Sequence, residues 1–236
     1  MINYIKLHFA FLMNNLMIIS IFVLQIITIF GIIYASNILK GYSYIDSFRD
    51  ELSIAFFSEA FMIIEVVLAI IAIFIATILQ TKTNNYLMFY TTYSNKEKLN
   101  FIIGKILAGM IVIVFLLLIN YLTIKVILYL SPFDIDINSI SKTIMHLFVE
   151  AFQLFSFTLA ILTLLNHFFI SIIPIILFWY LEIISMNPTN LNDLLLKIFL
   201  NINPYIENNI NLEMPILFTI FYLSIYILIS YKKDCC

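Results

Sequence analysis

Residues 80–105, QTKTNNYLMFYTTYSNKEKLNFIIGK, decide how this chain folds. They form a long polar interruption between two of the most apolar runs in the sequence, and they carry four of its twelve basic residues. Four aromatic residues in it recur at the spacing of one helix face: Tyr86, Phe89, Tyr90 and Tyr93. The pattern predicts a short helix with an aromatic face, capped at its start by Thr83 or Asn84.

A second helix start follows directly. Ser94 and Glu97 have the S-x-x-E spacing of a capping box, and an apolar run begins at Leu99. The stretch is therefore typical of a short helix, a break and the beginning of a long membrane helix. It is either a docking surface for a partner protein or an ordinary basic loop whose aromatic side chains rest at the lipid interface.

The composition around this stretch indicates a membrane protein. The chain is 63% hydrophobic and 11% charged over 236 residues, which is more apolar surface than a soluble domain of this size could bury. A helix needs about 20 mostly apolar residues to cross a bilayer. Six segments meet this requirement, at about 16–35, 54–79, 101–130, 141–165, 168–186 and 214–231. The runs are continuously apolar, so we expect an all-α integral membrane protein with a single transmembrane domain over 1–236, and no barrel.

The basic residues predict the orientation of these spans. With the N-terminus in the cytoplasm, seven basic residues lie inside and five outside; the inner ones are Lys6, Lys82, Lys96, Lys98, Lys105, Lys232 and Lys233. Six is an even number, so both termini are expected in the cytoplasm. Frequent Ile, Asn and Phe with few Gly is typical of AT-rich bacterial genomes, so we expect a bacterial cell membrane.

Amphipathic segments accompany the spans. Residues 2–16 place apolar side chains on one helix face, as in a helix that lies in the inner membrane interface: Ile2, Ile5, Phe9, Leu12, Met13 and Leu16. A second such pattern lies within 187–213, before the last span. Asn166 and His167 form a very short inner turn after the fourth span.

Polar side chains also occur inside the predicted spans. Glu65 lies fifteen residues before Gln80, near or just outside the midplane, where a carboxyl group costs several kcal/mol unless it is paired, protonated or wetted. The fourth span carries a polar stripe on one face: Lys142, His146, Glu150 and Gln153. These side chains either line a cavity that opens outward or form hydrogen bonds between helices.

Signatures of catalysis, metal binding and nucleotide binding do not appear in the sequence. His8, His146 and His167 are isolated, with no H-E-x-x-H motif. Gly104 precedes a lysine, but Leu99 occupies the position of the earlier P-loop glycine. We therefore expect no enzyme activity, no metal site and no cofactor in this chain, and no binding of nucleic acid.

The order of these features resembles the membrane subunit of type-2 ABC exporters over nearly the whole chain. That family has a cytoplasmic elbow helix, six spans, a long second inner segment and an amphipathic external segment before the last span. The stretch 83–105, TNNYLMFYTTYSNKEKLNFIIGK, is similar to the family's coupling segment. There, a short coupling helix precedes a serine-led basic turn and either a glycine-lysine pair or a lone lysine at the mouth of span three.

The resemblance implies a separate cytoplasmic ATPase, which holds ATP and Mg, and a second membrane subunit as a homodimer or heterodimer. The residues that would contact the ATPase are Tyr86, Phe89, Tyr90, Tyr93, Lys96 and Lys98. The substrate path would contain Glu65, His146, Glu150 and Gln153. Small members of this family often export such substrates, so the resemblance implies export of an amphipathic or antimicrobial peptide or a lipid-like molecule. The alternative is an immunity or scaffold protein that binds a toxin or partner without transport.

Overall fold

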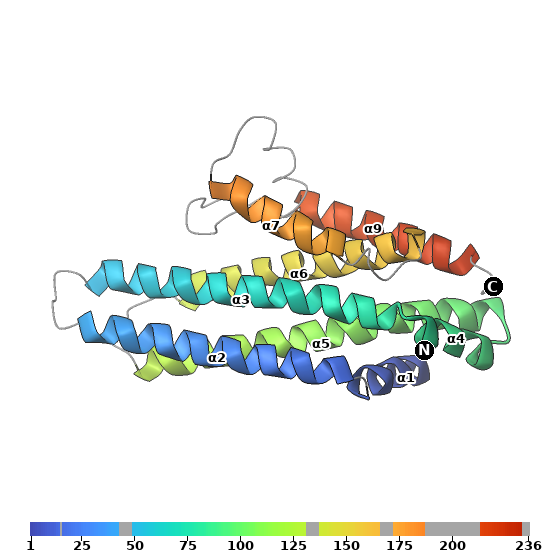
Figure 1. Ribbon diagram of the computed structural model, residues 1–236, viewed down its shortest axis with the longest axis horizontal. Helices are drawn as coiled ribbons and strands as arrows, with labels where there is room; N and C mark the ends of the chain where they lie inside the picture. The colour runs from blue at the N-terminus through green and yellow to red at the C-terminus, as the bar shows by residue number, and fades with distance from the viewer. Residues whose placement is uncertain (15, 43–48, 131–136, 166–171, 187–212, 233–236) are drawn as a thin grey trace.

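The computed structural model describes residues 1–14, 16–42, 49–130, 137–165, 172–186 and 213–232, and within them every regular element is a helix. The helices are α1 (Ile2–Met13), α2 (Leu16–Tyr42), α3 (Arg49–Leu79), α4 (Lys82–Thr91), α5 (Asn95–Leu130), α6 (Ile137–Leu165), α7 (Ile172–Met186) and α9 (Glu213–Lys232) (Figure 1). The predicted all-α fold is therefore confirmed for these residues.

Four of the helices contain stretches long and apolar enough to cross a membrane: Ala60–Leu79, Asn95–Tyr129, Ile140–Leu165 and Glu213–Lys232. α2 contributes a shorter apolar stretch, Ile19–Tyr34, and α7 has 15 residues. By the length and hydropathy of its helices, the chain is an integral membrane protein. Residues 168–171 of the predicted fifth span, the inner turn at 166–167 and most of the segment 187–213 lie outside the described residues.

Several helices extend beyond the apolar runs from which they were predicted. α2 continues to Tyr42 and α3 begins at Arg49, although the predicted spans ended at 35 and began at 54. α5 and α6 likewise begin at Asn95 and Ile137, before the predicted starts at 101 and 141. Hydropathy marks the part of a helix that suits hydrocarbon, whereas the backbone hydrogen-bond ladder can continue through polar residues on either side.

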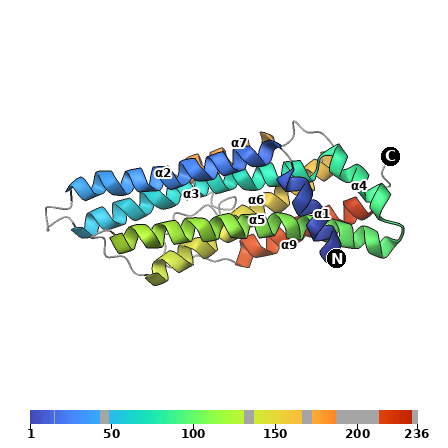
Figure 2. The same ribbon diagram turned by 90° about the horizontal axis from the view of Figure 1, so that it is seen from below.

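The long helices lie side by side along the long axis of the molecule. α6 packs between α3 on one side and α9 on the other, and α2 packs against α3 (Figure 1). α1, α4 and the end of α9 all lie at the same end of the bundle, which both views show (Figures 1 and 2). This end, called the α4 end below, holds the candidate functional site.

A glycine and a buried amide pair link α5 to its neighbours in the bundle. A Cβ on Gly109 of α5 would clash with the ring of Phe155 of α6, so the glycine lets these helices approach. Between α2 and α5, the Gln25 side-chain amide donates a 2.6 Å hydrogen bond to Asn120 Oδ1, and both side chains are buried. The bond satisfies polar groups that would otherwise face hydrocarbon.

α1 uses two sides. Its buried residues are His8 and Leu12, while Ile2, Phe9 and Met13 are exposed. The predicted apolar face is therefore split, because α1 packs onto α5 through a side that includes a histidine. The exposed apolar side chains remain on the surface at the α4 end, as a helix in a membrane interface requires.

Candidate functional site

α4 is a ten-residue helix that connects α3 to α5. Its N-cap is Thr81, whose side chain makes no capping hydrogen bond, so the prediction of a cap at Thr83 or Asn84 is wrong. Asn84 is instead fully buried, and its amide donates to the backbone oxygen of Leu79 at 2.7 Å. Its side chain fastens α4 to the end of α3.

The other side of α4 carries exposed aromatic rings. Tyr86, Tyr90 and Tyr93 are 55%, 77% and 89% exposed, whereas Met88 is buried. We call these three tyrosines the aromatic face; the side chain of Phe89, predicted with them, lies outside the described residues. The predicted aromatic face of the short helix is observed at Tyr86 and Tyr90, whereas Tyr93 follows the end of α4.

The predicted capping box is confirmed at the start of α5. The carboxylate of Glu97 accepts hydrogen bonds from the backbone N–H groups of Tyr93 (2.7 Å) and Ser94 (3.2 Å). In return, the N–H of Glu97 donates to Ser94 Oγ at 3.3 Å. This reciprocal arrangement orders the turn between α4 and α5 and orients the two helices with respect to each other.

Lys105 of α5 contacts the inner side of α4. Its ammonium group donates a 2.5 Å hydrogen bond to Asn85 Oδ1 on α4 and lies 5.5 Å from the ring centroid of Phe101. Only 3% of the residue is exposed, so it differs from Lys96 and Lys98. Lys96 is exposed, and Lys98 places its Nζ 5.6 Å from the ring centroid of Tyr231, near the end of α9.

His8 of α1 joins the same group of contacts. Its Nδ1 lies 3.2 Å from Asn84 Oδ1 and its Nε2 lies 3.1 Å from the backbone oxygen of Phe101. Its ring meets the Phe101 ring edge-on, with centroids 4.4 Å apart. Burial, and next the nearby charge of Lys105, lower the pKa of His8 from 6.5 to about 4. The imidazole is therefore neutral at pH 7.

Tyr4 and Gly104 bring α1 close to both neighbours. The Tyr4 hydroxyl donates a 2.9 Å hydrogen bond to the backbone oxygen of Thr91, at the end of α4. Burial and the charge of Glu97 raise the pKa of Tyr4, which keeps this donor protonated. A Cβ on Gly104 would lie 2.9 Å from Tyr4 Cβ, so only glycine permits this approach of α1 to α5.

These contacts form one unit, which we call the helix-end cluster: Tyr4, His8, Asn84, Asn85, Gly104 and Lys105. It joins α1, α4 and α5 through polar groups at the α4 end. Sequence patterns had treated His8 as isolated, because its two hydrogen-bond partners are 76 and 93 positions away. The sequence feature that could have indicated the cluster is the Gly-Lys pair at 104–105. It combines a glycine that allows close helix approach with a cation that is buried.

The polar residues predicted for a substrate path lie on α3 and α6. Glu65, His146 and Glu150 are half-buried and Gln153 is buried. Gln80, which directly follows α3, donates a 3.0 Å hydrogen bond to Thr163 Oγ1 of α6, and this bond aligns the ends of the two helices. Counted back from that bond at about 1.5 Å per residue, Glu65 and Glu150 reach similar levels in the bundle.

The polar groups of the helix-end cluster position helices. The cluster consists of amides, a buried cation, a neutral imidazole and a phenol, which together hold α4 in one orientation and leave its tyrosines outward. In the described residues, no three His, Cys, Asp or Glu side chains are grouped as metal ligands.

Comparisons with protein-family models, with curated proteins and with solved structures found no match to this chain.

Proposed function

We propose that this chain is the permease subunit of an ATP-driven exporter of the type-2 ABC kind. It would work with a separate cytoplasmic ABC ATPase, which binds ATP and Mg, and with a second membrane subunit. In this proposal α2 and α7 also cross the membrane, for six spans in all, and both termini lie in the cytoplasm of a bacterial cell.

The observation that carries the proposal is the arrangement of α4. Its aromatic face is exposed, while its opposite side is held by Asn84 and Asn85 through contacts to α1, α3 and α5. A surface that is apolar, outward and rigidly supported suits a protein that must receive force from a partner. An ordinary interfacial loop has no need of buried polar contacts on its inner side, since water can satisfy its backbone and side chains there.

The substrate would be an amphipathic peptide or a lipid-like molecule that moves out of the cell. Glu65, His146, Glu150 and Gln153 supply hydrogen-bonding groups within otherwise apolar helices, and Glu65 and Glu150 reach similar levels of the bundle. These hydrogen-bonding groups suit a molecule that presents a polar side to the protein and an apolar side to lipid.

The test is co-purification of the full-length chain with an ABC ATPase from its own membranes. Replacing Tyr86 and Tyr90 together by alanine should lower recovery of the ATPase tenfold or more. Burying one aromatic ring is worth about 1.5–3 kcal/mol, and 1.4 kcal/mol is a tenfold change in affinity. Tyr129→Ala is the matched control, because Tyr129 is 90% exposed at the opposite end of α5.

Two outcomes would count against the proposal. Equal ATPase recovery in the double variant and in Tyr129→Ala would remove the aromatic face from the contact. Absence of any ABC ATPase from the wild-type preparation, with resistance to a toxin retained in cells, would favour the immunity protein that binds without transport.

A further inference from the structure

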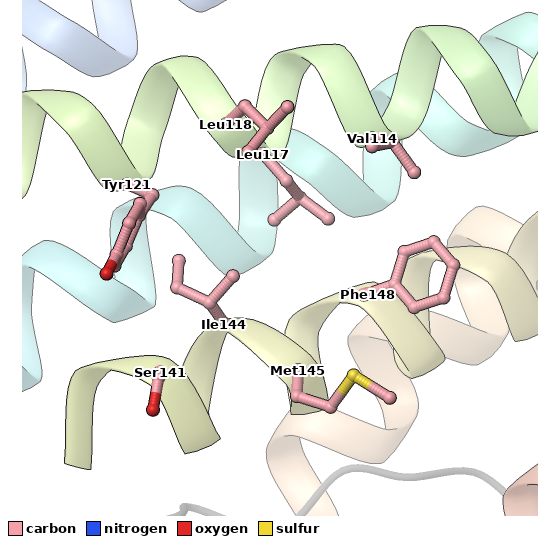
Figure 3. A pocket seen from close by; sticks show the side chains of 8 residues that line it. All are labelled: Val114, Leu117, Leu118, Tyr121, Ser141, Ile144, Met145 and Phe148. Carbon is pink, nitrogen blue, oxygen red and sulfur yellow. The ribbon is translucent and has the colours of Figure 1, made fainter. Parts of the chain in front are cut away.

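A groove of about 350 Å³ lies between α5 and α6, beyond the middle of α5 as seen from α4 (Figure 3). Most of its lining is apolar, and the groove is open at the surface: Val114 and Leu118 of α5 and Met145 of α6 line it and are 38%, 53% and 50% exposed. Because α5 and α6 are membrane helices, this surface faces either lipid or another membrane protein rather than water.

The exposed lining of the groove is apolar throughout, and a basic side chain stands beyond one end of it. Tyr121 and Ser141 line the end farther from α4 (Figure 3). Lys125 continues the same stripe of α5, one turn beyond Tyr121. It is exposed, and its Nζ lies 4.7 Å from the Tyr121 ring centroid. A cation thus stands beyond the end of an apolar groove.

We propose that this groove binds a phospholipid. One acyl chain occupies the groove, and Lys125 binds the phosphate. From Leu118 to Lys125 the helix rises about 10 Å, so the cation stands at the headgroup level when the apolar part contacts the upper acyl chain. A lysine near a helix end extends its ammonium group toward that level.

Charge and polarity favour a lipid over other occupants. A phospholipid is apolar along its chains and anionic at one end, which matches the order of side chains along the groove. A headgroup with net negative charge, such as phosphatidylglycerol, should bind better than zwitterionic phosphatidylcholine, because Lys125 places a positive charge near the end of the groove. The site does not depend on the proposed exporter role.

The test uses the purified full-length chain in detergent, mixed with phosphatidylglycerol or phosphatidylcholine, with bound lipid counted by native mass spectrometry. Lys125→Ala should lower retained phosphatidylglycerol at least fivefold and bring its ratio to phosphatidylcholine close to one. The matched control is Lys142→Ala, which removes a cation from the same end of α6 but off the groove-facing stripe. Met145→Trp should fill the groove and lower retention of both lipids several-fold.

Leu122→Trp is the control for the added bulk, since Leu122 is 59% exposed next to Tyr121 but does not line the groove. Retention of lipid in Lys125→Ala and Met145→Trp within twofold of their controls would overturn the proposal. A shift of Met145→Trp from dimer to monomer with lipid retention unchanged would also overturn it, because a second copy of the chain would then be the occupant.

Discussion

His8 has a charge state set by its surroundings rather than by the pH of water. The ring is buried with oxygen atoms near both nitrogens, and the buried ammonium group of Lys105 is nearby. Desolvation and that positive charge both oppose a second proton, and together they outweigh the two hydrogen bonds that favour it. The neutral ring can therefore lie between α1, α4 and α5 without a counter-charge.

We expect this histidine to make the folded protein sensitive to acid. Between pH 6.5 and about 4, the unfolded chain binds a proton on His8 that the folded chain does not bind. The contribution of His8 to the free energy of unfolding is therefore fully present above pH 6.5. It is lost as the pH drops to about 4, which lowers the free energy of unfolding by up to about 3 kcal/mol. Thermal melting of the purified protein across this range measures the effect.

Carboxylates titrate in the same range, so the comparison with His8→Gln isolates the histidine. Glutamine can retain a hydrogen bond to Asn84 or to the Phe101 oxygen but has no proton to gain. The variant should lose stability less steeply than the wild type between pH 6.5 and 4. Parallel melting curves of the two proteins against pH would contradict the assignment.

Residues whose partners are local could be predicted, and residues whose partners are distant could not. Ser94 and Glu97 interact over three positions, so their spacing alone identifies the capping box. His8, Asn84 and Lys105 come from three helices, and no periodicity within one segment shows that they meet. Lys105 was counted with the other inner cations, although it is buried and bonded to α4.

Helix contacts at the α4 end depend on the surface of α5 at Gly104. Gly104→Ala should destabilise the protein by about 1–3 kcal/mol, the usual cost of overpacking, because the new Cβ would lie 3.2 Å from the backbone carbon of Tyr4 as well as 2.9 Å from its Cβ. A lower melting temperature and faster hydrogen exchange in α1 are the expected results.

Gly31→Ala on α2 is the matched control for that substitution. There the new Cβ would lie 3.6 Å from the nearest atom, Ile63 Cδ1, which is an ordinary contact. This variant should melt close to the wild type. Equal melting temperatures for the two alanine variants would show that α1 can move away from Gly104 at no cost.

Long apolar runs made the membrane helices predictable, whereas their ends were not. α5 was expected from residue 101 but begins at Asn95, where the capping box provides the local signal. α4 was expected to begin after Thr83 or Asn84, because both are good capping residues. Asn84 instead serves the contact with α3 and α1, and this tertiary role outweighs the local preference.

At the scale of the whole molecule, the structure places both described chain ends beside α4 (Figure 1). A membrane around the four long apolar helices therefore leaves α1, α4 and the end of α9 on one side. The excess of basic residues in these parts predicts that this side is the cytoplasm. Tyr129, at the other end of α5, should then face the cell exterior.

Thiol labelling of intact cells checks this orientation. A membrane-impermeant maleimide should leave the natural Cys235 and Cys236 unlabelled until the cells are permeabilised. Tyr129→Cys, in a chain whose two natural cysteines are replaced by serine, should be labelled without permeabilisation. Labelling of Cys235 or Cys236 on intact cells would reverse the orientation.

The amide pair between Gln25 and Asn120 limits how the bundle can change shape. A slide of α2 along α5 by one helical turn would separate the two side chains by about 5.4 Å and leave two amides without partners in hydrocarbon. The 2.6 Å bond therefore fixes the position of α2 along the axis of α5. Any movement that begins at α4 must carry α2 and α5 together, by rotation or tilting rather than by sliding.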